Sequence, residues 1–118
     1  MLRRTKYASM KNRDKYLIKC IKKHYSELVD EFKLVNDFDG FCENKVLNKA
    51  IKMDLLQIGE NINHLTNETK LMLNKRDLVG IIDIRNQVAH GYVYLEDKII
   101  WLIISNDLPK LMEQIEVI

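Results

Sequence analysis

Two long segments of this chain repeat apolar residues with the period of an α-helix. In residues 13–35 and again in residues 44–65, the apolar positions are spaced by three, four or seven residues. They are Leu17, Ile21, Leu28 and Phe32 in the first segment, and Leu47, Ile51, Leu55, Ile58, Ile62 and Leu65 in the second. This spacing gathers the apolar side chains on one face and predicts two long amphipathic helices.

Shorter elements are expected between and after these two helices. Residues 36–40 have the composition of a turn. Thr66 to Thr69 are rich in helix-capping residues and predict a short helical turn that ends near Leu73. A third helix is expected over residues 77–89, followed by Gly91 as a left-handed cap.

The last helix is expected over residues 95–116. Pro109 removes a backbone donor inside it, so a kink or break is expected near residues 105–108. Residues 99–104 are apolar around the whole circumference of this helix, which is unusual at the surface of a small monomer. The run therefore lies at the centre of the bundle or is covered by a second chain.

Composition narrows the class of protein. Four glycines and one proline in 118 residues argue against an all-β fold. The longest apolar run is too short to cross a membrane, and no apolar segment typical of a signal peptide follows the basic N-terminus. Cys20 and Cys42 lack metal-ligand spacing and are expected to be reduced thiols in a cytoplasmic protein. The prediction is an all-α, antiparallel bundle of four to five helices, forming one domain over residues 13–118.

Charge is distributed unevenly along the chain. The formal net charge is +2, but residues 1–23 hold nine of the 19 basic residues and only one of the 17 acidic residues. We expect residues 1–12 to form a flexible basic arm. Such an arm either binds an anionic partner or is simply solvated.

Residues 85–92, which read RNQVAHGY, place a group of chemically useful side chains at the predicted end of the third helix. Arg85 is a permanent cation whose planar donors fit a phosphate. His90 can accept or donate a proton near neutral pH, and Asn86 could orient either a phosphate or the imidazole. These residue types suffice to cut a phosphodiester without a metal.

The spacing of Arg85 and His90 sets a condition on this site. On one straight helix they would lie roughly 140° apart around the axis. They can converge only if the helix ends before His90 or if one of them comes from another molecule. Gly91 favours the first arrangement. A two-fold dimer would supply the second, with two arginines and two histidines in one cleft.

The same motif resembles that of the HepT-like ribonucleases of the HEPN superfamily: an arginine, four residues, a histidine, one residue and a tyrosine. Gly59-Glu60 resembles a Gly-Glu pair of that family, and Trp101 with residues 107–111 resembles the end of its fourth helix. Residues 75–79 depart from the family, which often has a Pro-Trp pair shortly before the motif. The resemblance covers most of residues 13–118.

This resemblance implies a specific function. HepT-like proteins are toxins of toxin–antitoxin pairs, and they act as homodimeric, metal-independent ribonucleases on RNA. Their catalytic pair corresponds to Arg85 and His90 and meets between protomers. Their partner is a minimal nucleotidyltransferase antitoxin, which in one branch transfers AMP to the tyrosine that corresponds to Tyr92. The alternative is a catalytically silent HEPN module that binds a nucleotidyltransferase partner or nucleotides.

Two further groups of residues are candidate sites. Glu60 lies within an apolar stripe, where a carboxylate is costly unless paired, so it either contacts Arg85 as a supporting residue or faces solvent. His24 with Glu27, and Glu60 with His64, have helical spacing suited to two metal ligands, but the sequence shows no third. The sequence therefore predicts neither a metal nor a cofactor.

Overall fold

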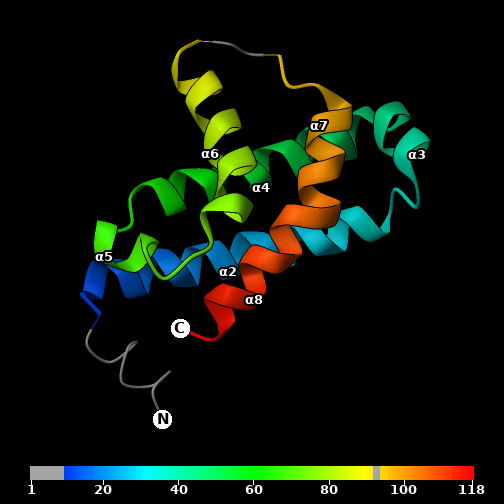
Figure 1. Ribbon diagram of the computed structural model, residues 1–118. Helices are drawn as coiled ribbons and strands as arrows, with labels where there is room; N and C mark the ends of the chain where they lie inside the picture. Colours follow the sequence, from blue (N-terminus) through cyan, green and yellow to red (C-terminus); the bar gives the residue numbers. More distant parts are fainter. Residues whose placement is uncertain (1–9, 92–93) are drawn as a thin grey trace.

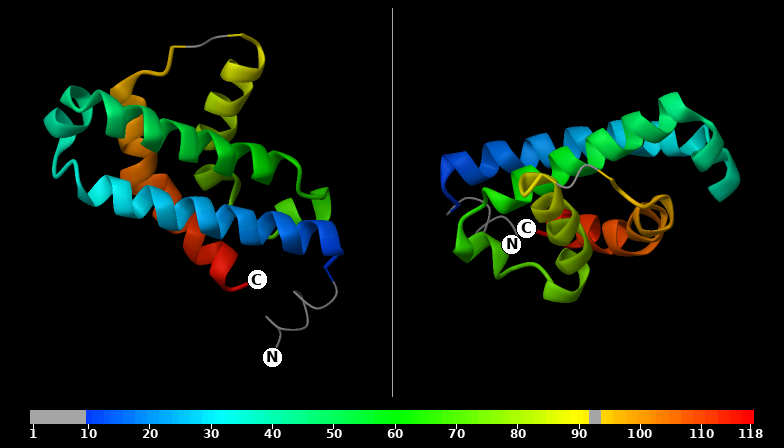
Figure 2. Two further views of the ribbon diagram at one scale, coloured as in Figure 1. Left: turned by 180° about the vertical axis from the view of Figure 1, so that it is seen from behind. Right: turned by 90° about the horizontal axis from the view of Figure 1, so that it is seen from above.

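The computed structural model describes residues 10–91 and 94–118. The described residues form helices and no strand, which confirms the expected all-α fold. Helices α2 (Asn12–Lys33) and α4 (Lys45–Asn63) lie side by side (Figure 1). Seen from above, the helices that follow α4 in the chain form a second layer beneath this pair (Figure 2).

The α2–α4 pair contributes the largest part of the core. Their expected apolar stripes face each other, and the bounds of both helices agree with the prediction to within two residues. Side chains with essentially no exposure on these two helices are Ile21, Leu28, Ile51, Leu55, Ile58 and Ile62. Burial of these branched side chains from both helices holds the layer together.

The prediction of a turn at residues 36–40 is only partly correct, because a short helix, α3 (Phe38–Glu43), begins within these residues. Asn36 does turn the chain, with a positive φ of 63°. The Asp37 side chain then accepts a hydrogen bond of 2.8 Å from the Gly40 amide and caps α3. Asp and Asn favour turns and helix N-caps for the same reason, so composition did not distinguish the two.

The expected short helix at residues 66–73 is present as α5 (Asn67–Lys70), capped by Thr66. The buried Asp14 carboxylate at the start of α2 accepts hydrogen bonds from the hydroxyls of Thr66 (2.7 Å) and Thr69 (2.6 Å). Burial would raise the pKa of Asp14, but these hydrogen bonds outweigh it and hold the pKa below its ordinary value. They tie α5 to the first turn of α2.

The last expected helix is interrupted where a kink was predicted. It consists of α7 (Asp97–Leu102), a π-helical turn η1 (Ile103–Asp107) and α8 (Leu108–Glu116). In a regular α-helix the Ser105 carbonyl would accept a hydrogen bond from the N–H of residue 109, which Pro109 lacks. The helix has the wider π-helical form immediately before Pro109.

The apolar run on α7 and η1 is partly buried and partly exposed. Trp101 packs against three aromatic rings of α2 and α3, at centroid distances of 4.7 Å to Phe32, 5.8 Å to Phe38 and 5.6 Å to Phe41. Ile99 and Leu102 remain 47% and 48% exposed. The run therefore faces the core on one side only.

A flexible basic arm was expected over residues 1–12, and residues 1–9 of it lie outside the described part of the chain. Met10 is buried, and Asn12 already belongs to α2. Within the described part of the chain, no helix combines the length and apolar character needed to span a bilayer.

Candidate active site

Helix α6 (Lys75–Ala89) carries the candidate residues and crosses α4 at Gly59. A Cβ atom at Gly59 would lie 3.2 Å from Ile81 Cγ2 and 3.4 Å from Arg85 Cβ, so the missing side chain permits this close approach. The crossing places the residue after Gly59, Glu60, beside Arg85. Beyond it, the C-terminal half of α6 extends past α4 and away from α2 (Figures 1 and 2).

An ion pair fixes the Arg85 side chain. Arg85 Nε donates to Glu60 Oε2 at 2.8 Å, which is one of the two alternatives that the sequence left open for Glu60, and Glu60 Oε1 lies 2.8 Å from His64 Nε2. The hydrogen bond from Arg85 is the main reason that the pKa of Glu60 falls below its ordinary value, and Glu60 in turn raises the pKa of Arg85. Both groups are therefore charged, and the guanidinium is held in one orientation.

Asn86 connects Arg85 to His90 through two of its atoms. Its side-chain Oδ1 accepts a hydrogen bond of 3.1 Å from Arg85 Nη1, and its backbone oxygen lies 2.7 Å from His90 Nδ1. Helix α6 ends at Ala89, and Gly91 has a φ of 89°. The helix thus stops before His90, which is the first of the two arrangements that the spacing allowed.

The contact with Asn86 also determines which nitrogen of His90 can act as a base. A carbonyl oxygen only accepts hydrogen bonds, so Nδ1 carries the proton in this contact. In the neutral ring, Nε2 then holds the free lone pair on an exposed side chain. Arg85 likewise keeps a free group. Its Nη2 makes no hydrogen bond with any described residue, so the Nη2 donors can bind a ligand.

The structure brings four of the five predicted site residues together. Glu60, Arg85, Asn86 and His90 form one chain of contacts, although no direct hydrogen bond joins Arg85 to His90 in the part of the chain described. Tyr92 lies outside the described residues. The arrangement offers one anchored cation and one proton-transfer group on an exposed helix end, which suits an anionic substrate such as a phosphodiester.

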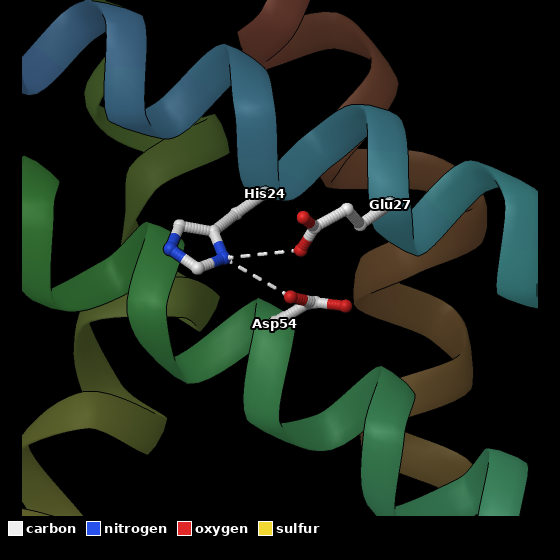
Figure 3. Close-up of side chains that lie close together, drawn as sticks. All are labelled: His24, Glu27 and Asp54. Carbon is white, nitrogen blue, oxygen red and sulfur yellow. Dashed lines mark hydrogen bonds and ion pairs between the residues drawn. The ribbon is translucent and has the colours of Figure 1, made fainter.

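A second polar cluster lies between α2 and α4 (Figure 3). His24 Nδ1 is 3.0 Å from Asp54 Oδ1 and 3.8 Å from Glu27 Oε2. The spacing of His24 and Glu27 is visible in the sequence, but Asp54 is thirty positions further on and was missed. Its signal was a carboxylate at a buried position of the α4 stripe, beside Leu55.

Glu31 borders this cluster from the next turn of α2. Burial, followed by a hydrogen bond with Asp54 and repulsion from it, raises the pKa of Glu31 to about 7. Glu31 Oε1 is buried, and no described residue hydrogen-bonds to it. The α2–α4 cluster of His24, Glu27, Glu31 and Asp54 therefore holds more acidic groups than nearby residues neutralise.

Comparison with known proteins finds a matching family and related sequences. The family model described as "Ribonuclease HepT-like" matches residues 22–118. A candidate RNase of Methanocaldococcus jannaschii is 26% identical over 90 residues, which cover 76% of this chain and 83% of the relative. No solved structure gives a significant match.

Two further relatives are also named as candidate RNases. One, from Caldanaerobacter subterraneus subsp. tengcongensis, is 29% identical over 79 residues, covering 67% of this chain and 70% of the relative. The other, also from M. jannaschii, is 32% identical over 82 residues, covering 67% of this chain and 65% of the relative. All three alignments cover about two thirds of this chain or more.

Proposed function

The chain belongs to the HepT-like ribonuclease family, and from this we propose that it is a metal-independent endoribonuclease, the toxin of a toxin–antitoxin pair. The observation that carries the proposal is the arrangement of Arg85 and His90. Asn86 links the two residues, and Glu60 fixes Arg85, at an exposed helix end. RNA contains its own nucleophile, so such a site needs only proton transfer and charge stabilisation.

In the proposed reaction, the RNA 2′-oxygen attacks the adjacent phosphorus while His90 Nε2 removes its proton. The bond from phosphorus to the 5′-oxygen breaks, and a second acid protonates that oxygen, leaving a 2′,3′-cyclic phosphate and a 5′-hydroxyl. The free donors of Arg85 stabilise the negative charge that develops on the non-bridging oxygens. Glu60 acts as a positioning residue because it holds the guanidinium.

The second acid is proposed to be His90 of another copy in a homodimer. One described chain supplies one such histidine, whereas a two-fold dimer brings the same residues to both sides of a cleft. The exposed side chains of Ile99 and Leu102 on α7, together with Tyr94 at 78% exposure, offer an apolar surface that a second copy would bury. Leu102→Glu should then give monomers in light scattering and lose RNA cleavage, whereas an active monomer would contradict the dimeric site.

Regulation is proposed to act on Tyr92 through a cognate minimal nucleotidyltransferase antitoxin. The tyrosine oxygen would attack the α-phosphate of ATP and release pyrophosphate, leaving AMP two residues from His90. The added negative charge would compete with RNA for Arg85. Mass spectrometry after incubation with the partner and ATP should find AMP on the wild type and on Tyr94→Phe, but none on Tyr92→Phe. Modification that persists in Tyr92→Phe would contradict the assignment.

RNA cleavage in the presence of EDTA tests the central proposal. The wild type and Asp83→Asn, which changes an exposed charge on the same helix, should cleave RNA, whereas His90→Ala and Arg85→Ala should not. Equal activity of all four proteins would refute the assigned site. No cleavage by a wild type that is folded, dimeric and free of AMP would instead support the silent module that binds a nucleotidyltransferase or nucleotides.

A further inference from the structure

We propose that His24, Glu27 and Asp54 bind a divalent transition-metal ion of the Zn²⁺ type, and that this ion joins α2 to α4. The three side chains point toward one another across the two helices (Figure 3). This site goes beyond the proposed ribonuclease activity and does not depend on it. The sequence alone gave only the pair on α2, and the third group comes from α4.

The distances between the candidate ligand atoms fit one small cation. The nitrogen and the two carboxylate oxygens all lie within 4.8 Å of one another. A tetrahedral Zn²⁺ with bonds of about 2.0–2.2 Å needs ligand atoms separated by roughly 3.3–3.6 Å. The distances from His24 Nδ1, 3.0 Å to Asp54 and 3.8 Å to Glu27, lie on either side of that value. Small side-chain rotations would therefore complete the geometry.

The ligand types favour a transition metal over Mg²⁺ or Ca²⁺. Imidazole nitrogen suits Zn²⁺ and its neighbours, whereas Mg²⁺ and Ca²⁺ prefer all-oxygen sites. The metal would take the place of the proton that His24 Nδ1 now shares with Asp54. Half of the Glu27 side chain is exposed, so the site opens to solvent on one side and a water can complete the coordination.

The surroundings supply too little positive charge for the acids present. Among the described residues, no lysine or arginine forms an ion pair with Glu27, Glu31 or Asp54. Glu31 Oε1, at the border of the cluster, is buried without a hydrogen-bond partner from the described residues. A buried polar atom in this condition is rare in folded proteins. A bound divalent cation would offset the negative charge of its two carboxylate ligands, Glu27 and Asp54.

The proposed role of this ion is structural. Asp54 contacts α2, whereas Glu60 on the same helix contacts Arg85 of α6, so the two sites use different faces of α4. A metal at the first site is therefore compatible with RNA cleavage that needs no metal at the second. Because the ion would bind the folded arrangement of α2 and α4, it should stabilise the native state.

Titration of the metal-free, full-length protein with Co²⁺ tests the proposal, since tetrahedral Co²⁺ reports its ligands by visible absorption. We expect one equivalent to bind, Zn²⁺ to displace it, and Zn²⁺ alone to raise the melting temperature. Glu27→Gln and Asp54→Asn should each weaken Co²⁺ binding by at least about tenfold, since even indirect changes near a metal cost that much. Mg²⁺ and Ca²⁺ at the same concentrations should leave the melting temperature unchanged.

His64→Gln is the matched control, because it removes another histidine that contacts a glutamate on a helix surface. It should bind Co²⁺ as the wild type does. Glu27→Gln is the cleaner of the two ligand variants, because the Glu27 side chain is half exposed and its replacement leaves the core packing intact. Failure of the wild type to bind Co²⁺, or equal binding by Glu27→Gln and Asp54→Asn, would overturn the proposal. Neither result would affect the ribonuclease assignment.

Discussion

Helix α4 carries two carboxylates that contact a histidine, and their surroundings differ in burial and in neighbouring charge: Asp54 is buried, whereas Glu60 is partly exposed. Glu60 contacts both His64 and Arg85, whereas Asp54 contacts His24 without any arginine. Next to the arginine, the pKa of Glu60 is lowered. Beside Asp54, burial and the neighbouring acids raise the pKa of Glu31 to about 7.

This difference shows how similar residue types acquire different roles. A full cation beside Glu60 produces a charged pair that orients a guanidinium toward solvent. Without that cation, the α2–α4 cluster retains protons or attracts an external cation. The first arrangement suits binding and transition-state stabilisation of an anion, whereas the second suits a structural link between helices.

The largest expected effect is on RNA cleavage, at the candidate active site on α6. His90→Ala removes the proposed general base and should lower kcat/KM for RNA cleavage by roughly 10²–10⁴-fold. Initial rates on a defined RNA with EDTA present would measure it, with Asp83→Asn as the control. A loss of less than about tenfold would mean that His90 does not transfer the proton.

The next largest expected effect is on the pH dependence of stability, through Glu31 of the α2–α4 cluster. The pKa of Glu31 is raised from 4.5 to about 7, so the folded state holds its proton more tightly than the unfolded state does. Stability from this group is complete below the unfolded pKa, and it is lost as pH rises through about 7. Glu31→Gln should remove this fall, a change on the order of 2 kcal/mol.

Urea unfolding of the metal-free protein at several pH values would measure this effect. Glu27→Gln is a useful comparison because that carboxylate is half exposed. Parallel stability curves for the wild type and Glu31→Gln across the neutral range would show that Glu31 is ionised throughout. The contrast between the two faces of α4 would then disappear.

A smaller effect tests whether Glu60 acts through Arg85. Glu60→Gln removes the charge that holds the guanidinium, and we expect kcat to fall about tenfold with KM little changed, because Arg85 acts mainly in the transition state. In the Arg85→Ala background the same substitution should have no further effect. An additive loss in the double variant would show that Glu60 acts elsewhere, for example through His64.

The sequence predicted one of these regions far better than the other. Arg85, Asn86 and His90 lie within six residues at the end of one helix, so the sequence alone could place them near one another, and Asn86 links the other two. The α2–α4 cluster depends on how two helices are aligned, and the spacing within each helix does not determine that alignment. The sequence therefore gave no reason to pair Asp54 with His24.

The fold too was predicted from the sequence where local patterns decide it, and it was missed where contacts between distant residues decide it. Periodicity located α2 and α4 because each buries a long apolar stripe, and Pro109 located the interruption at η1. Helix α3 was missed because Asp37 can begin either a turn or a helix. Its place depends on Phe41 packing against Trp101, a contact between residues sixty positions apart.

The smallest expected effect concerns the backbone that ends α6. Gly91 has a φ of 89°, and apart from its chain neighbours no described residue has an atom within 4 Å of the position of an added Cβ, so Gly91→Ala adds backbone strain without a clash with those residues. It should lower the free energy of unfolding by about 1 kcal/mol, and Gly91→Asn by less, since asparagine tolerates this conformation. Urea unfolding would rank the three proteins. Equal stability of all three would mean that the helix end rearranges freely, and the position of His90 would then not depend on Gly91.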